Sequence, residues 1–337
     1  MKDINLKELK NWELESLNGP IMLSWDVTNR CNFNCQHCLN RSNDCKAHDF
    51  SDELTDKECD MLVQQIIDVR PYSMCICGGE PTLRSNLFDI ISKISKSGCK
   101  VNMVSNGYLI DEDYAQKLVE AGLFFLQISL DSIHPELHDK FRGRDGAFDA
   151  AVRALKILSK TNVVIATAMT PTKFNIHEFP EYVDFIRSLG CNYVRMMPIL
   201  PMGRGYEHFK DLEPTAEQYL KFVVDIEKIK VKYPDFRVEW GDPLEHIYLA
   251  EYTKRTQPIV MEIRSNGDIG VSIYLPISVG NIRRHSIKEY WDGGYKHIWG
   301  HEEVKKLARS INTIEDFKKL SLRTWNIKRK TLDILED

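Results

Sequence analysis

The chain lacks the features that direct a protein to a membrane or to nucleic acid. No apolar run approaches the roughly 18 residues of a membrane span, and the N-terminal stretch MKDINLKELKNWELE lacks the apolar run of a secretory signal. The formal net charge of −4 leaves no basic excess for nucleic acid or for an anionic lipid surface. We therefore predict a cytoplasmic protein whose partners include neither nucleic acid nor a membrane.

Cysteine is missing from the last part of the chain, because none of the nine cysteines follows Cys191. An odd number of cysteines without a secretory signal suits metal ligation better than a disulfide framework. Cys31, Cys35 and Cys38 stand at CxxxCxxC spacing in the stretch WDVTNRCNFNCQHCL. Thiolates so close in sequence are the usual ligands of iron–sulfur clusters and of zinc.

The number of ligands separates these two metal sites. A structural zinc site closes with a fourth nearby Cys or His, and His37 is the residue that can complete it. A 4Fe–4S cluster held by three cysteines instead keeps one iron open for a small molecule. Three unrelated cysteines, one of them in the core, are the remaining alternative.

Strand-like and helical segments alternate along most of the 337 residues. Such alternation predicts a parallel α/β fold, and because a closed barrel needs eight strands, we expect a partial (β/α)6 TIM-like barrel. Its chemistry should then lie at the C-terminal ends of the strands. The expected strands are 21–26, 72–77, 100–105, 124–130, 163–169 and 193–198, and the expected helices are 52–69, 86–97, 111–121, 148–161 and 176–189.

The cysteine motif also carries a family resemblance. CNFNCQHC resembles the cluster-binding loop of the radical S-adenosylmethionine (SAM) enzymes. The resemblance implies one 4Fe–4S cluster on Cys31, Cys35 and Cys38, whose open iron binds the amino and carboxylate groups of SAM. It also implies cleavage of SAM to a 5′-deoxyadenosyl radical that abstracts hydrogen from a substrate, and it makes His37 a predicted cofactor-binding residue.

The second expected strand ends in Gly78-Gly79-Glu80-Pro81. Two glycines allow a tight turn and a close approach of the backbone to a ligand. This segment resembles the family motif that binds the methionine amino group of SAM through its backbone and the carboxylate of Glu80. An ordinary strand–helix turn with a solvated glutamate is the alternative.

The third expected strand ends in Ser105-Asn106-Gly107. Asn and Gly are typical of a turn, which is one reading of this segment. By resemblance, Ser105 and Asn106 lie near the amino group or the ribose of SAM.

Ser129 and Asp131 follow the fourth expected strand and share one face, so both can point into the barrel. A helix N-cap at Asp131 or Ser132 is the alternative. By resemblance, Ser129 contacts SAM and Arg142 pairs with its carboxylate, a contact that suits a guanidinium group. Arg144 is the competing arginine.

Other residues in the barrel region have simpler interpretations. We read Cys75 and Cys77 as small core residues, and His134 and His138 as part of a solvated helix face. The turn around Arg204 resembles the segment that closes the barrel in the SPASM subgroup of radical SAM enzymes, which modifies peptides and proteins.

The C-terminal part is similar in layout to the SPASM extension. Asn266-Gly267 predicts a hairpin, and Gly280-Asn281-Ile282 matches a turn that follows it in that subgroup. Ser272 stands where a cysteine ligand would follow the hairpin, so we expect a degenerate α+β extension without auxiliary clusters. The predicted divisions are an N-terminal helix at 1–20, the partial barrel at 21–212, a helical connector at 213–250 and the extension with C-terminal helices at 251–337.

The sequence therefore predicts a radical SAM enzyme. A ribosomally made peptide that is crosslinked or epimerised is the first expected substrate, and a small molecule of cofactor, haem-like or sugar-derived metabolism is the second. A non-catalytic iron–sulfur or zinc-binding protein is the alternative from another class. We expect a flavodoxin or ferredoxin as electron donor, and we name Asp242 and Tyr274 as further acid–base or hydrogen-donor residues.

Overall fold

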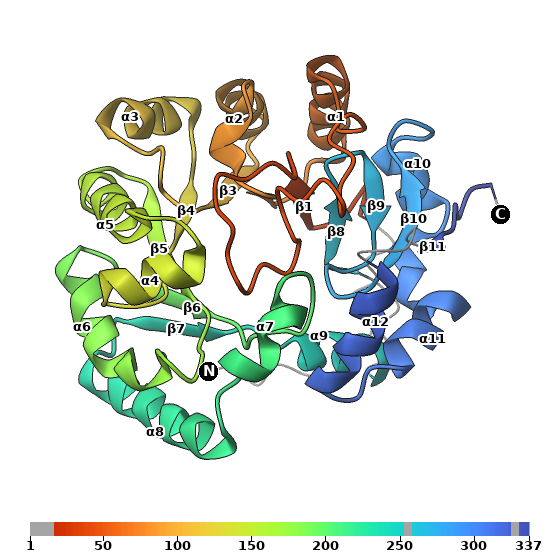
Figure 1. Cartoon of the computed structure of the whole chain (residues 1–337). Helices are drawn as coiled ribbons and strands as arrows, with labels where there is room; N and C mark the ends of the chain where they lie inside the picture. The colour runs from red at the N-terminus through yellow and green to blue at the C-terminus, as the bar shows by residue number, and fades with distance from the viewer. Residues whose placement is uncertain (1–16, 253–257, 325–329, 337) are drawn as a thin grey trace, which may run out of the picture.

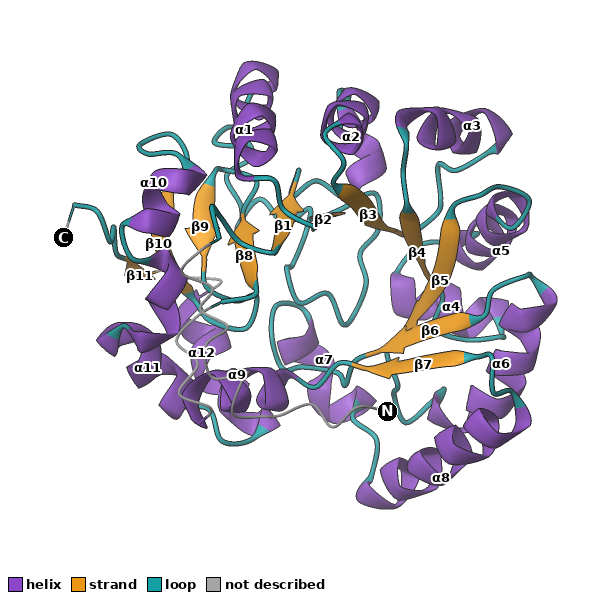
Figure 2. Ribbon diagram, turned by 180° about the vertical axis from the view of Figure 1, so that it is seen from behind, coloured by secondary structure: helices purple, strands orange, loops and turns teal. Residues whose placement is uncertain are grey.

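The computed structural model describes residues 17–252, 258–324 and 330–336. Most of the predicted N-terminal helix, residues 1–16, lies outside the described residues. One sheet in the order β11-β10-β9-β8-β1-β2-β3-β4-β5-β6-β7 curves through the molecule (Figures 1 and 2). Its strands are β1 Met22–Asp26, β2 Ser73–Cys77, β3 Lys100–Ser105, β4 Phe125–Ser129, β5 Val164–Met169, β6 Tyr193–Met196, β7 Arg237–Trp240, β8 Val260–Ile263, β9 Asp268–Gly270, β10 Ile277–Asn281 and β11 Lys330–Thr331.

The six expected barrel strands are confirmed as β1 to β6, and neighbours in this series pair in parallel. The fold class is therefore confirmed, but the parallel part of the sheet is longer than expected. Strand β7 pairs in parallel with β6, and β8 pairs in parallel with β1. Strand β7 lies within residues 213–250, where we expected only helix. The sequence did not reveal it, because the four-residue segment RVEW is too short to show an apolar alternation.

Helices cover the outer face of the curved sheet, where α1, α2, α3, α5 and α6 follow successive strands (Figure 1). The first of them starts at Asp56 rather than at 52, because Thr55 caps it: the Thr55 hydroxyl accepts from the Glu58 N–H. The helices are α1 Asp56–Val69, α2 Leu87–Lys96, α3 Glu112–Ala121, α4 Pro135–Arg142, α5 Ala147–Leu158, α6 Phe179–Ser188, α7 Gly205–Leu212, α8 Ala216–Lys232, α9 Pro243–Tyr252, α10 Ile287–Asp292, α11 Glu302–Arg309 and α12 Phe317–Thr324. None of the described helices is long and apolar enough to cross a membrane.

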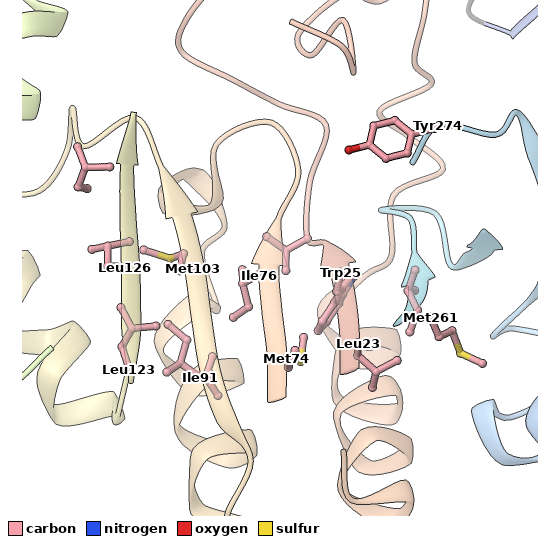
Figure 3. Packing of buried hydrophobic residues seen from close by; sticks show 14 of the residues in the cluster. Leu23, Trp25, Met74, Ile76, Ile91, Met103, Leu123, Leu126, Met261 and Tyr274 are labelled. Atoms are coloured by element: carbon pink, nitrogen blue, oxygen red, sulfur yellow. The ribbon is translucent and has the colours of Figure 1, made fainter. Parts of the chain in front are cut away.

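Alternate residues of the barrel strands face opposite sides of the sheet. Leu23 and Trp25 on β1, and Met74 on β2, are fully buried in the main hydrophobic core together with side chains of α1 and α2 (Figure 3). The residues between them face the concave side. Cys75 and Cys77 belong to this second set and are only half-buried. The prediction that they are core residues is therefore wrong.

The C-terminal extension continues the same sheet. The predicted hairpin at Asn266-Gly267 is confirmed, since β8 and β9 pair in antiparallel fashion and Gly267 has a φ of +84°. Gly280 and Asn281 belong to strand β10 instead of a turn, because Asn281 pairs with Asp268 of β9.

Candidate functional site

The cysteine loop follows β1 and is fixed first by the turn after β2. The Gly79 N–H donates to the Thr28 carbonyl at 2.7 Å, and the Glu80 N–H donates to the Arg30 carbonyl at 2.8 Å. A Cβ atom on Gly79 would lie 2.1 Å from the Arg30 carbonyl oxygen. We expected the backbone to come close to a ligand at this glycine. Gly79 instead comes close to the backbone of Arg30, the residue that precedes Cys31.

The far end of the loop is fixed by Arg204, which precedes α7. Its buried guanidinium group donates from Nε to the Cys35 carbonyl and from Nη1 to the Ser42 carbonyl, both at 2.9 Å. Its backbone N–H donates to the Cys38 carbonyl at 2.9 Å. The neighbouring Gly203 lies so close that a Cβ atom on it would be 2.3 Å from the same Cys38 oxygen. The turn at Gly203 and Arg204 therefore holds the loop at both Cys35 and Cys38.

The loop and the strand ends enclose a cavity of about 110 Å³. All three predicted metal ligands line it, and so do all the predicted cofactor-binding residues except Asp131. Four residues that the sequence did not assign to the site join them. The full lining is Cys31, Phe33, Cys35, His37, Cys38, Ser42, Gly78, Gly79, Glu80, Val104, Ser105, Asn106, Ser129, Arg142 and Arg204.

Glu80 is a buried carboxylate held by four hydrogen bonds. Oε1 accepts from the Ser105 hydroxyl at 2.8 Å and from both the hydroxyl and the N–H of Thr82, while Oε2 accepts from the Asn106 N–H at 2.8 Å. Burial nevertheless raises the pKa of Glu80, because these donors only partly offset the loss of solvent. The alternative of a solvated glutamate is wrong, and Ser105 and Asn106 serve first to position this carboxylate.

Asp131 lies behind the cavity wall and supports Arg142. The Arg142 Nε donates to Asp131 Oδ2 at 2.5 Å, and the Thr170 N–H donates to Asp131 Oδ1 at 2.9 Å. Nη1 of Arg142 lies 4.0 Å from the Cys35 sulfur. The expectation that Asp131 points into the SAM site is therefore not met, since its carboxylate orients the arginine that lines the cavity.

The competing arginine, Arg144, lies elsewhere. Its guanidinium group covers the Tyr108 ring at 4.7 Å and donates to the Tyr108 hydroxyl at 3.0 Å. Arg144 is not among the residues that line the cavity, so Arg142 is the arginine of this site.

Two histidines contribute neutral rings near the site. His37 stacks on Phe141 with ring centroids 4.2 Å apart, and its buried Nδ1 has no hydrogen-bond partner among the described residues. Burial, with Arg142 and Arg204 nearby, lowers the pKa of His37 well below its usual value. His138 is also buried and accepts the Asp131 N–H at Nδ1, at 3.1 Å. The solvated face that we predicted for the HPELH stretch is wrong at His138.

Burial makes the thiols of Cys31 and Cys35 hard to ionise. Burial raises the pKa of Cys31 to about 12 and that of Cys35 to about 11. Because desolvation penalises the thiolate, a positively charged metal centre would supply the missing compensation. Among the described residues, no three His, Cys, Asp or Glu side chains gather closely enough to hold a single metal ion.

Comparisons with known proteins identify the family. The radical SAM superfamily profile matches residues 25–186. Mycofactocin maturase MftC of Mycolicibacterium smegmatis is 33% identical over 87% of this chain and 73% of its own length. The chain belongs to the radical SAM superfamily.

Two further relatives extend the likeness. An AdoMet-dependent heme synthase of Methanosarcina barkeri is 26% identical over 86% of this chain and 87% of its own length. The crystal structure of Streptococcus suis SuiB bound to S-adenosylmethionine shares the fold, with a TM-score of 0.68 at 15% identity over 98% of this chain and 80% of that one.

The protein is therefore a radical SAM enzyme, whose cofactors are a 4Fe–4S cluster and SAM. When bound, these cofactors supply a 5′-deoxyadenosyl radical, which takes a hydrogen atom from the substrate. The residues of the cavity suit both groups. Three thiols provide ligands for iron, Glu80 and Arg142 provide one negative and one positive group, and the unpartnered Nδ1 of His37 is a further polar atom.

Sequence reasoning missed Arg204 as a site residue, although the Gly–Arg–Gly turn was noticed. Its partners are backbone carbonyl groups of the cysteine loop, which leave no mark in side-chain identity. Asp242, one of the two further residues we named, instead caps α9, since its Oδ1 accepts the Leu244 N–H at 2.8 Å. Tyr274 is buried, and its hydroxyl contacts the Met197 sulfur at 3.3 Å.

Proposed function

We propose that Cys31, Cys35 and Cys38 hold the 4Fe–4S cluster and that the surrounding cavity binds the methionine part of SAM. Glu80 presents a buried carboxyl group, oriented by hydrogen bonds beside the strand ends, and suits the amino group. Arg142 also lines the cavity, and its guanidinium group suits the carboxylate of SAM. Gly78, Gly79, Ser105, Asn106, Ser129 and His37 complete the SAM site.

The observation that carries this proposal is that all three thiols line one cavity together with Glu80 and Arg142. A cavity of about 110 Å³ is far larger than a single metal ion needs. A zinc site made by these cysteines and His37 would require their ligand atoms to converge on one point. The arrangement therefore favours a multi-iron cluster over a single metal ion.

Anaerobic reconstitution tests the assignment. Protein reconstituted with iron and sulfide should contain about four iron atoms per chain and should form 5′-deoxyadenosine from SAM and dithionite. Replacing Cys35 by Ala should remove both the cluster and the product, whereas Cys45→Ala, at an exposed loop cysteine, should change neither. About one zinc atom per chain without sulfide would contradict the proposal.

We further propose a peptide as the substrate. MftC, a maturase, resembles this chain along most of its length. SuiB has been solved with its precursor peptide SuiA, and anSMEcpe with a Cp18Cys peptide, so this fold can receive a peptide. Among the described strands, β7 and β11 end the sheet without pairing to each other, so the sheet does not close into a complete barrel.

An iron porphyrin is the second candidate substrate, because relatives named AdoMet-dependent heme synthase and Fe-coproporphyrin III synthase also match. Two additions to the reconstituted enzyme separate the candidates. A synthetic peptide encoded by a short open reading frame beside the gene should increase 5′-deoxyadenosine formation and itself change in mass. An increase with Fe-coproporphyrin III and none with the peptide would overturn the peptide proposal.

We also propose that the cluster on these three cysteines is the only one in the protein, because residues 251–337 contain no cysteine. We propose that the chain divides into barrel, connector and extension, whose strands all belong to one continuous sheet. A flavodoxin or ferredoxin is the proposed electron donor, and replacing dithionite by either protein tests it.

A further inference from the structure

Cys75 and Cys77 form a pair of thiols on the cavity side of strand β2. Their sulfur atoms lie 3.2 Å apart and are joined by a hydrogen bond. Met74 and Ile76, which alternate with them, are fully buried in the main core (Figure 3). Both residues are only partly buried and belong to the set that faces the concave side of the sheet.

The register of the sheet brings this pair next to the cofactor site. Ile76 pairs with Met103 of β3, so the next residues along, Cys77 and Val104, also lie side by side. Val104 lines the cofactor cavity, as does Gly78, the residue that follows Cys77 in the chain. The thiols therefore stand on the same face as the cavity, at its border.

The surroundings of the pair are polar. Ser24 and Asp26 of β1 lie opposite Cys75 and Cys77 in the register, and the Ser24 hydroxyl donates to the Cys77 sulfur at 3.9 Å. Arg264 pairs with Asp26 at 3.1 Å. The hydrogen bond between the thiols lowers the pKa of Cys75 and raises that of Cys77. A packing role alone does not account for two hydrogen-bonded thiols in such a polar setting.

We propose that Cys75 and Cys77 are a redox-active dithiol that donates a hydrogen atom to a carbon radical of the substrate. The S–H bond is weak compared with C–H bonds, so a thiol readily quenches a carbon radical. A second thiol at 3.2 Å is placed to capture the sulfur radical that results. This inference rests on the proposed function, since it needs a substrate radical in the barrel.

The step balances as follows. The substrate radical takes a hydrogen atom from one thiol and becomes a closed-shell C–H product. The second thiol releases a proton to solvent and forms the S–S bond with the sulfur radical, and the extra electron passes to a one-electron carrier of the ferredoxin or flavodoxin class. Two electrons and two protons from a low-molecular-weight dithiol restore both thiols for the next turnover.

A disulfide at this position would be readily reduced. Alternate residues of a strand have Cα atoms about 6.6 to 6.8 Å apart, which is the upper end of the range that a disulfide can span. Strained disulfides have more oxidising potentials and are the labile ones. Such a bond suits a catalytic cycle better than a structural role.

The first experiment follows the thiols without the cofactors. Apoprotein is equilibrated with oxidised glutathione, the remaining thiols are alkylated, and the peptide that carries Cys75 and Cys77 is analysed by mass spectrometry. We expect this peptide to lose two hydrogens, to resist alkylation, and to recover both thiols with dithiothreitol. Cys99, which is buried just before β3, should stay a free thiol.

The second experiment uses the reconstituted enzyme with SAM and dithionite in D2O, where thiols carry deuterium. Without substrate, the adenosyl radical is quenched by the nearest hydrogen donor, so wild-type 5′-deoxyadenosine should contain one deuterium atom. The Cys75→Ser/Cys77→Ser variant should still form 5′-deoxyadenosine but lose the label, because a hydroxyl does not give up its hydrogen atom. Cys45→Ser is the matched control and should keep the label.

The outcomes separate this inference from the proposed function. A pair that stays reduced in oxidised glutathione, or a label that persists in the double variant, overturns the dithiol. Unlabelled 5′-deoxyadenosine from the wild type overturns it as well and leaves radical formation intact. No 5′-deoxyadenosine from any variant would defeat the proposed function, and the dithiol with it.

Discussion

At the scale of single residues, short sequence motifs predicted most of the residues of the candidate site. CxxxCxxC and Gly-Gly-Glu could be read directly, because their chemistry depends on residue type and spacing within one loop. Asp131 was expected to point into the barrel, but its carboxylate pairs with Arg142, which lies one helix further on, and that pairing depends on how α4 packs. The turn around Arg204 could be identified by resemblance, but its contact with the cysteine loop could not, because the atoms that Arg204 binds are backbone carbonyl oxygens.

The buried pair of Asp131 and Arg142 should contribute strongly to stability. Asp131→Asn keeps the shape of the side chain but leaves the guanidinium group buried without its counter-charge. We expect the free energy of unfolding of the apoprotein to fall by roughly 3 kcal/mol, measured by urea denaturation. Asp184→Asn removes the exposed partner of Lys232 and should cost less than about 1 kcal/mol. Equal costs at the two sites would contradict this account of Asp131.

Arg204 is a positioning residue for the cluster loop. Arg204→Lys keeps the charge but cannot make the two-pronged contact with the Cys35 and Ser42 carbonyls. We expect a chelator to remove iron from this variant roughly tenfold faster or more, measured by loss of the cluster absorbance. Arg144→Lys, outside the cavity, is the matched control and should release iron at the wild-type rate.

At the scale of elements, the cysteine loop is built by its neighbours rather than by its own secondary structure. The turn after β2 holds its start, the end of α4 accepts its Gln36 N–H through the Phe141 carbonyl, and the turn before α7 holds its end. Strands β1 to β6 were predictable because apolar runs alternate with amphipathic helices. Strand β7 and the pairing of β8 with β1 were not, since a four-residue strand shows no period and pairing partners distant in sequence leave no local signal.

The contact between Gly79 and the loop gives a prediction at this scale. Gly79→Ala places a Cβ atom 2.1 Å from the Arg30 carbonyl, so the two loops must separate. We expect the free energy of unfolding to fall by roughly 1 to 3 kcal/mol and the reconstituted iron content to fall with it. In Gly270→Ala the new Cβ would be 3.6 Å from its nearest neighbour and should leave both quantities close to wild type. Wild-type iron content in Gly79→Ala would show that the loop tolerates the displacement.

At the scale of the whole molecule, barrel and extension are one sheet. Strand β8 belongs to the extension in sequence but pairs with β1 in the barrel, where Leu23 lies opposite Met261. Both of these residues are fully buried in the main core. The extension is therefore part of the barrel wall and does more than follow it.

Removing the extension should accordingly damage the barrel. A chain that stops at residue 257 exposes the edge of β1 and part of the core, and exposed edges of this kind promote aggregation. We expect this truncated chain to be insoluble or to sediment as large aggregates. Co-expression of residues 258–337 as a separate fragment should restore a folded complex. A monomeric, cooperatively unfolding 1–257 fragment would show that β8 is dispensable.

The pairing of β1 with β8 also bears on how the protein is made. Since β8 ends at Ile263, a ribosome must add about 240 further residues after β1 emerges, which takes roughly 10 to 50 s at 5 to 20 residues per second. Throughout this interval one edge of β1 has no strand to pair with, and the barrel wall beside the cysteine loop is incomplete. A cluster inserted before β8 is made would therefore meet an incomplete barrel wall, so we expect cluster assembly to follow the synthesis of β8. Chaperones that bind extended segments have their longest opportunity at the N-terminal strand.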